Sequence, residues 1–305
     1  MPLIRSLRYL IEYGFVRALI AALRLLPLDT AGKLTGRIAM LVGPRTSLHQ
    51  RALANIATAL PELSDGDRMH ILAAMWRHTG LVIAETLMLD RLLADPGRLE
   101  VVDATALEQA LAAPGPNIGI TPHMGNWELV AMAVAKCGGK LAGVYRPLRN
   151  PYLDRHIHAQ RQQLYPAGLL FKGTKGGTHQ LGEATRIAID FLRKGGHLGF
   201  AADQVESAAS FTVPFFGLAA TFSPAPAMFA RRLGARIWVG RCLRVGGRSQ
   251  FRFEYRELEV PRTAEADADI EAITADMAAQ FEAWIRQTPE QWMWWQRRTI
   301  GGLRA

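Results

Sequence analysis

Apolar and polar residues follow two different patterns along the chain, and the pattern changes at the Asp-Pro-Gly break at 95–97. Before the break, residues 28–93 carry apolar positions at the spacing of helices and predict three of them. The first ends at the Gly-Pro pair 43–44, the second stops before Pro61, and the third follows a capping-box pattern at 64–67. This part of the chain is therefore expected to be helical.

From about residue 100 onward, strand patterns alternate with helix patterns, which is typical of a largely parallel or mixed sheet. The clearest unit, residues 117–139, is a short apolar run, a turn and a helical pattern that stops at a glycine pair. Further strands end at Tyr145 and just before Asp203, and residues 180–194 read as a helix between them.

The predicted fold class is therefore α/β: a mixed, largely parallel sheet flanked by helices and preceded by an N-terminal helical region. Three segments are expected. They are residues 1–26, an interfacial helix; residues 27–97, the helical region; and residues 98–305, the α/β domain.

The N-terminal segment predicts a helix that lies on a membrane surface. Its longest uninterrupted apolar run, residues 18–23, is far shorter than the about 20 residues of a membrane-spanning helix. On a helical wheel Leu7 and Ile11 share one face, while Arg8 and Glu12 lie opposite. No convincing cleavage site follows, so a removed signal peptide is not expected. An ordinary amphipathic helix packed on the domain is the open alternative.

The chain of 305 residues has a net charge of +9 and a pI near 10.0. Such an excess of positive charge indicates a polyanionic partner, for example an anionic membrane, a phosphorylated lipid or an acidic carrier protein. Nucleic acid is not expected, because the sequence has no zinc-finger, RNP or basic-heptad pattern. The two cysteines, Cys137 and Cys242, stand in apolar runs, which fits core positions in a reducing compartment.

One pair of residues in the 117–139 unit has the composition of a general base. His123 follows the predicted strand, and Glu128 falls in the first turn of the following helix. We expect Glu128 to orient the His123 imidazole and to stabilise its charged form. No Ser or Cys lies nearby, which favours direct attack by a substrate hydroxyl. The alternative is structural: His123 ends a strand, and Glu128 complements a helix dipole.

Three other features contain residue types that can carry chemistry. Asp203 follows a strand as His123 does, so it could orient His123 or an arginine, or only cap its strand. The glycine-rich segment 172–177 lacks the spacing of a phosphate loop and predicts a surface loop. His156 and His158 have no partner at ligand spacing, so no metal site is expected.

The segment HMGNWEL at 123–129 resembles the H-x4-D/E motif of the lysophospholipid acyltransferase superfamily. It is most similar to the HxGNWE form of the late acyltransferases of lipid A biosynthesis, the lauroyl and myristoyl transferases. Three further blocks follow in that family's order: YRPLRNPYLD with Arg161 downstream, ADQ followed by FTVPFFG, and PEQWMWWQRR. The tryptophans of the last block suit either a membrane–water interface or a buried plug. One departure is Gln296, where family members often carry His.

The resemblance implies roles for particular residues. Arg146 and Arg161 match the family pattern and are expected to hold phosphate or carbonyl groups of the substrate. Phe215 and Phe216 are expected to line the acyl pocket, with an aromatic core as the alternative. The catalytic pair is His123 and Glu128, and the candidate substrate-binding residues are Arg146, Arg161, Asp203 and Asn126, the last at a helix N-cap position.

The resemblance also implies an activity: O-acyl transfer from an acyl-carrier-protein thioester to the 3-hydroxyacyl hydroxyl of a Kdo-bearing lipid A precursor. No cofactor is expected. The partners would be the acyl carrier protein, the lipid precursor and the anionic surface of the inner membrane, at whose cytoplasmic face the protein would lie. The alternatives are a lysophosphatidic acid-type acyltransferase, a non-catalytic lipid-binding protein and a zinc hydrolase.

Overall fold

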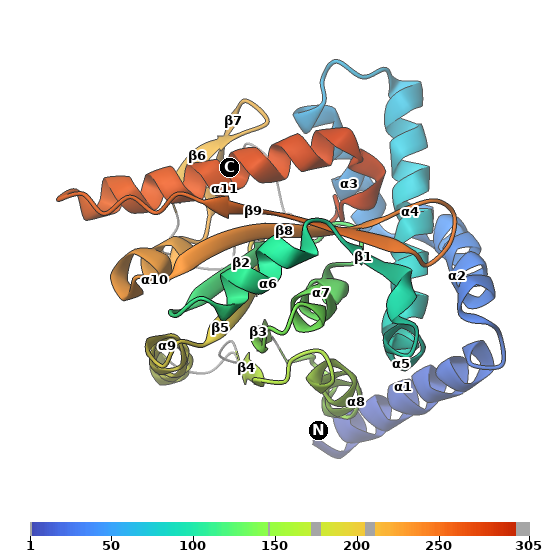
Figure 1. The fold of residues 1–305 in the computed structure, drawn as a ribbon. Helices are drawn as coiled ribbons and strands as arrows, with labels where there is room; N and C mark the ends of the chain where they lie inside the picture. The colour runs from blue at the N-terminus through green and yellow to red at the C-terminus, as the bar shows by residue number, and fades with distance from the viewer. Residues whose placement is uncertain (1, 146, 172–177, 205–210, 297–305) are drawn as a thin grey trace.

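One seven-stranded sheet organises the protein (Figure 1). The computed structural model describes residues 2–145, 147–171, 178–204 and 211–296. The strand order is β1-β9-β8-β2-β5-β3-β4, and every neighbouring pair is parallel except β8 with β9. This confirms the predicted α/β class with a mixed, largely parallel sheet. The strands are β1 (Leu99–Val101), β2 (Asn117–Thr121), β3 (Leu141–Tyr145), β4 (Leu169–Phe171), β5 (His197–Ala201), β8 (Arg236–Arg244) and β9 (Phe251–Leu258).

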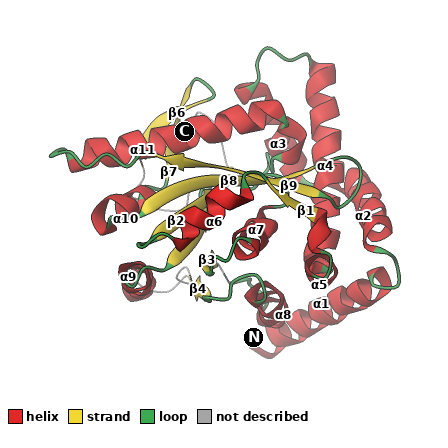
Figure 2. Cartoon of the chain, viewed as in Figure 1, coloured by secondary structure: helices red, strands yellow, loops and turns green. Residues whose placement is uncertain are grey.

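Helices cover both faces of the sheet, and each face has its own apolar core (Figure 2). One core joins α9 (Thr178–Arg193), α10 (Ala225–Leu233) and α11 (Ala266–Gln287) to the strands. The other lies against α6 (Ala104–Ala112) and α7 (Val130–Lys136). The strands that bear the site therefore sit between two packed layers, which hold them rigid.

The N-terminal helices are α1 (Pro2–Leu23), α2 (Leu28–Val42), α3 (Ser47–Ala59), α4 (Asp65–Leu87) and α5 (Leu89–Leu93). The predicted cap of the long helix is present, since Ser64 Oγ accepts the backbone N–H of Asp67 at 3.1 Å. Helix α1 lies beside α8 (Pro151–Gln162), as Figure 1 shows. Within the described part of the chain, none of the helices has the length and apolarity needed to cross a membrane. The interfacial role of α1 and the division into three segments stay predictions.

The carboxyl ends of β2 and β5 place the site. These two strands pair in parallel, with Asn117 opposite His197 and Thr121 opposite Ala201. The turns that follow them therefore leave the sheet at the same edge, where open α/β folds bind ligands. The pairing brings His123 and Asp203 together, although 80 residues separate them.

Candidate active site

His123 stands two residues beyond the end of β2, in a turn that leads into the short 3₁₀ helix Trp127–Leu129. Its side chain is 15% exposed and lines a cavity. The ring packs against the edge of Trp127, with centroids 5.2 Å apart. The imidazole is thus held in place and still reaches the cavity.

Asp203 is the carboxylate that orients His123. Its Oδ1 lies 2.5 Å from His123 Nδ1, and its Oδ2 accepts the His123 backbone N–H at 2.8 Å. Trp292 Nε1 donates to the same Oδ2 at 2.8 Å. Burial raises the pKa of Asp203, but the imidazole and these hydrogen bonds outweigh burial and hold the pKa below its ordinary value. An ionised Asp203 keeps the proton of His123 on Nδ1, so Nε2 carries the lone pair of a general base.

Glu128 does not take the role expected from its sequence neighbourhood. Its carboxylate pairs with Arg161 of α8, whose Nε lies 3.0 Å from Glu128 Oε2 and whose Nη2 contacts Oε1. The expectation that Glu128 orients His123 is therefore wrong. The 3₁₀ turn directs the Glu128 side chain toward α8, and the position next to the imidazole belongs to Asp203.

Arg161 lines the cavity, and its role in substrate binding stays a prediction. Burial lowers the pKa of Arg161, but the charge of Glu128 and the hydrogen bonds to it raise the pKa above its ordinary value. The guanidinium also lies over the ring of Tyr145, 5.4 Å from its centroid. The wall of the cavity thus carries the Arg161–Glu128 ion pair in a fixed position.

The turn between His123 and Glu128 is fastened from behind by a buried polar network. Asn126 Nδ2 donates to Glu85 Oε2 at 2.9 Å, and Glu85 is paired with Arg244 at 2.5 Å. His78 Nε2 donates to the carbonyl of Gly125 at 3.0 Å. Asn126 is 1% exposed, makes no side-chain cap and does not line the cavity. Asn126 stands at the predicted N-cap position, but its amide faces the interior and holds the turn instead of capping the helix. Substrate binding by Asn126 stays a prediction.

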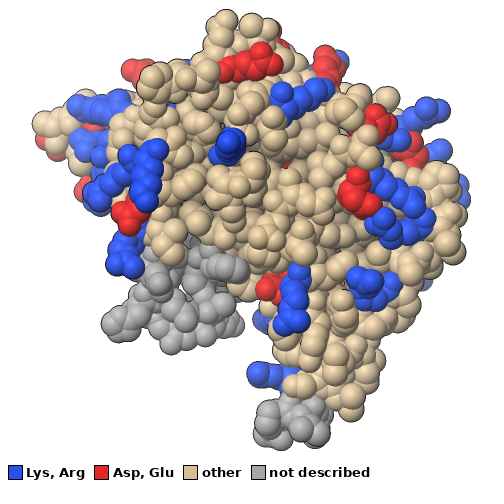
Figure 3. Space-filling view, turned by 60° about the horizontal axis from the view of Figure 1, so that its bottom comes forward, with Lys and Arg blue, Asp and Glu red and all other residues tan. Residues whose placement is uncertain are grey.

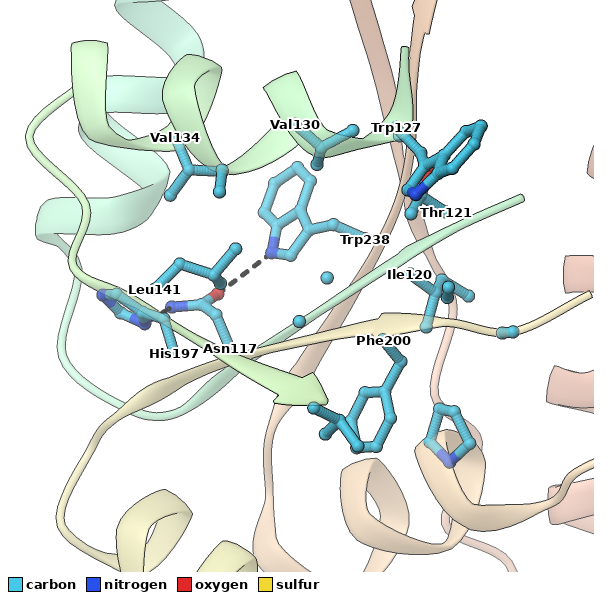
Figure 4. A pocket seen from close by; sticks show the side chains of 18 of the residues that line it. Asn117, Ile120, Thr121, Trp127, Val130, Val134, Leu141, His197, Phe200 and Trp238 are labelled. Atoms are coloured by element: carbon cyan, nitrogen blue, oxygen red, sulfur yellow. Dashed lines mark hydrogen bonds between the residues drawn. The ribbon is translucent and has the colours of Figure 1, made fainter. Parts of the chain in front are cut away.

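The cavity has a volume of about 540 Å³ and a mostly apolar lining. Figure 4 shows Val130, Val134 and Leu141 on one side of the strands, and Ile120 and Phe200 on the other. A space of this kind suits a hydrocarbon chain and offers few polar partners. Its polar lining residues near the sheet edge include His123, Glu128, Arg161 and Gln204.

Phe215 and Phe216 are not part of this cavity. They end the first strand of the hairpin formed by β6 (Phe211–Phe215) and β7 (Leu218–Phe222). Both rings are buried and pack against each other and against Trp292, at centroid distances of 4.6 to 6.4 Å. The expectation that they line the acyl pocket is wrong, because the hairpin directs them into the core, as the alternative had it.

A family model for the bacterial lipid A biosynthesis acyltransferases matches residues 2–299. The chain belongs to this family. The phosphatidylinositol mannoside acyltransferase of Mycolicibacterium smegmatis (strain ATCC 700084 / mc(2)155) is 26% identical over 206 residues, which are 68% of this chain. The match covers 64% of that relative, so the chain spans slightly less than two thirds of its length.

The family's last block supplies a site residue that the sequence left open. Trp292 is 1% exposed and donates to Asp203, and Met293 N–H donates to the carbonyl of His123 at 3.1 Å. Trp292 and Met293 of this block therefore support the His123 turn from the interior. The family pattern singles out this block in the sequence. The contacts of Trp292 with Asp203 and of Met293 with His123 give the physical reason. Gln296 accepts a hydrogen bond from Gln204.

The remaining candidates divide into two groups. Arg146 and the segment 172–177 lie outside the described residues. His156 contacts Arg17, and the ring of His158 packs on Tyr145. Within the described ranges, no group of three or more His, Cys, Asp or Glu side chains has the geometry to hold a metal ion.

Proposed function

We propose that this protein transfers a fatty acyl group from an acyl-carrier-protein thioester to the 3-hydroxyacyl hydroxyl of a Kdo-bearing lipid A precursor. The observation that carries the proposal is the His123–Asp203 pair, whose imidazole lines a mostly apolar cavity. Family membership supports acyl transfer and a lipid A-type acceptor. The net charge of +9 fits an acidic carrier protein and a phosphorylated lipid.

In the proposed reaction, His123 Nε2 accepts the proton of the acceptor hydroxyl while its oxygen attacks the thioester carbonyl carbon. The new C–O bond forms, the C–S bond breaks, and the leaving thiolate accepts the proton from the imidazolium. Asp203 stabilises that imidazolium between the two proton transfers. Arg161 lies near enough to the cavity to counter negative charge on the carbonyl oxygen or on substrate phosphate.

The relative from M. smegmatis favours a second candidate acceptor. Its name gives a mannoside lipid as the acylated molecule, so a glycolipid hydroxyl of that kind is the main competitor for this site. A lysophosphatidic acid-type acceptor and non-catalytic lipid binding are the remaining alternatives.

The test is transfer by the purified protein from acyl-carrier-protein thioesters to three acceptors: the Kdo-lipid A precursor, a phosphatidylinositol mannoside and lysophosphatidic acid. We expect mass spectrometry to find one added acyl chain on the Kdo-lipid A precursor, and the same chain to be missing from lipid A of cells without the gene. Transfer only to one of the other two acceptors would reassign the acceptor substrate. Lipid binding without consumption of the thioester would refute the proposed acyltransferase activity.

We further propose that α1 attaches the protein to the cytoplasmic face of the inner membrane. Leu7, Ile11 and Phe15 are 60%, 65% and 72% exposed, a large apolar surface for side chains on one helix. Figure 3 shows this end of the molecule as a protruding lobe of mostly uncharged atoms with basic side chains around it. The last turns are anchored, because Ile20 and Leu23 are buried in the core.

A further inference from the structure

Three glycines lie side by side across the centre of the sheet. Gly119 of β2 is opposite Gly199 of β5, and Gly199 is opposite Gly143 of β3. Side chains at neighbouring register positions share a face, so the three leave a depression in the sheet surface. The ring of Tyr165 fills the space at Gly143, and Leu141 lies close to Gly199. At Gly119, a Cβ would meet no atom within 4 Å.

The open space above Gly119 is an apolar slot under α6 and α7. Gly119 lines the same cavity as His123, and five aliphatic side chains line the cavity on the α6–α7 side of the sheet. They are Leu107 and Leu111 of α6, Val130 and Val134 of α7, and Leu141 of β3. The slot therefore provides apolar contacts to an alkyl chain along its length.

A hydrogen-bonded group of three side chains, the Asn117–His197–Trp238 trio, closes the slot on the side of the strands' amino ends (Figure 4). Asn117 and His197 begin β2 and β5, and Trp238, which is opposite Gly119 on β8, reaches back to Asn117 with its indole. Trp238 Nε1 donates to Asn117 Oδ1 at 2.9 Å, and Asn117 Nδ2 lies 3.1 Å from His197 Nδ1. The guanidinium of Arg236 lies 4.6 Å over the Trp238 ring. Pushing an alkyl chain between these partners would leave buried polar groups unpaired, at a cost of about 1–3 kcal/mol each.

Because the trio closes one end of the slot, the slot has a defined length. It runs along β2 from Thr121, near His123, to Asn117, and both residues line the cavity. Four residue steps of a parallel strand advance about 13 Å, which is roughly the length of ten carbon–carbon bonds in an extended chain. A longer chain would meet the trio.

We propose that Gly119 and the Asn117–His197–Trp238 trio set the length of the acyl chain that the protein accepts. The chain lies over Gly119 on the α6–α7 side of the sheet, and its methyl end stops against the trio. The inference rests on the proposed acyl transfer and names the specificity-determining residues of that site.

The experiment compares wild type with Gly119→Ala and Gly119→Val. Gly247→Val is the matched control, because Gly247 is exposed in the β8–β9 turn and a Cβ added there would also meet no atom within 4 Å. Binding of saturated fatty acids from butanoate to palmitate is measured by displacement of a fluorescent fatty acid. The valine side chain occupies the volume of about three methylene groups, so affinity for the longest bound chain should fall at least about tenfold. Butanoate, which is too short to reach Gly119, should change by less than about twofold.

Gly119→Ala should give an intermediate shift, and Trp238→Phe, which removes the hydrogen bond to Asn117 and shortens the ring, should extend the length limit. An unchanged length profile in folded Gly119→Val, or an equal loss for all chain lengths in both Gly119 variants, would overturn the inference. Transfer assays separate it from the proposed function. If the Gly119 variants change the length limit for binding but the protein transfers no acyl group, the proposed function is refuted and the slot is not. If the protein transfers acyl groups but the variants leave the length limit unchanged, the slot is refuted and the function is not.

Discussion

His123 Nδ1 and Asp203 Oδ1 lie 2.5 Å apart, and the two residues follow neighbouring parallel strands. Neither residue is near the other in the chain, so the pair depends on the β2–β5 register. Asp203 is 2% exposed and also accepts hydrogen bonds from the His123 backbone and from Trp292. This second set of bonds fixes the carboxylate before any substrate arrives, which is the preorganisation that general-base catalysis requires.

The first prediction tests Asp203 as the carboxylate that orients His123. Asp203→Asn should lower kcat by about a thousandfold, because the amide cannot stabilise the imidazolium and favours the wrong tautomer of His123. His123→Ala should abolish transfer. Initial rates measured over a pH series, with circular dichroism to verify the fold, provide the check. Near-normal turnover of folded Asp203→Asn would contradict the assignment of Asp203 as the orienting group.

The second prediction concerns the Glu128–Arg161 pair. Glu128 is buried and Arg161 is only 24% exposed at the side chain, so loss of either partner leaves an unpaired charge in the cavity wall. A double-mutant cycle of Glu128→Gln and Arg161→Ala, read by urea unfolding, should give a coupling free energy of about 1–3 kcal/mol.

The cycle also tests the role that the sequence suggested. In the Arg161→Ala background, Glu128→Gln should change kcat by less than about threefold if Glu128 acts through Arg161. A large further loss of kcat in that background would show that Glu128 acts on His123 directly.

The third prediction uses the buried His78. Burial, followed by the charge of Arg244, lowers the pKa of His78 from 6.5 to about 3. The folded protein keeps His78 neutral where the unfolded chain binds a proton. The contribution of neutral His78 to the free energy of unfolding is therefore fully present above pH 6.5 and is lost as the pH falls toward 3. The free energy of unfolding should change by at most about 1.4 kcal/mol per pH unit in this range.

His78→Gln should remove this slope and retain a donor for the Gly125 carbonyl. Urea unfolding of wild type and variant at several pH values within that window gives the difference, and the exposed His70→Gln on the same helix serves as the control. Parallel curves for wild type and His78→Gln would mean that His78 does not contribute to the pH dependence.

The fourth prediction concerns the exposed face of α1. Ile11→Glu with Phe15→Glu should reduce sedimentation with anionic phospholipid vesicles at least about tenfold, since each side chain contributes about 1.5–3 kcal/mol when it leaves water. Ile187→Glu, at an exposed apolar position on α9, is the matched control. Deletion of residues 1–26 is a less specific test, because it also removes Ile20 and Leu23 from the core. Unchanged sedimentation of the double variant would exclude α1 as the attachment.

The sequence by itself determined the local units and the positions of their polar ends. The alternation of strand and helix patterns specified an α/β fold, and His123 and Asp203 were each placed after a strand. These features depend on periodicity and on turn residues within a short window, where side-chain spacing and backbone geometry are directly coupled.

Only the tertiary structure decided which units meet. Nearness in the chain predicts Glu128 as the partner of His123, yet the order of the strands places Asp203 beside the imidazole, and Glu128 pairs with Arg161. Phe215 and Phe216 have the composition of an acyl pocket, but their hairpin buries them in the core, and the cavity opens instead over Gly119. Strand order and cavity position arise from packing between distant segments, and no local pattern of residues records which distant surface each side chain will face.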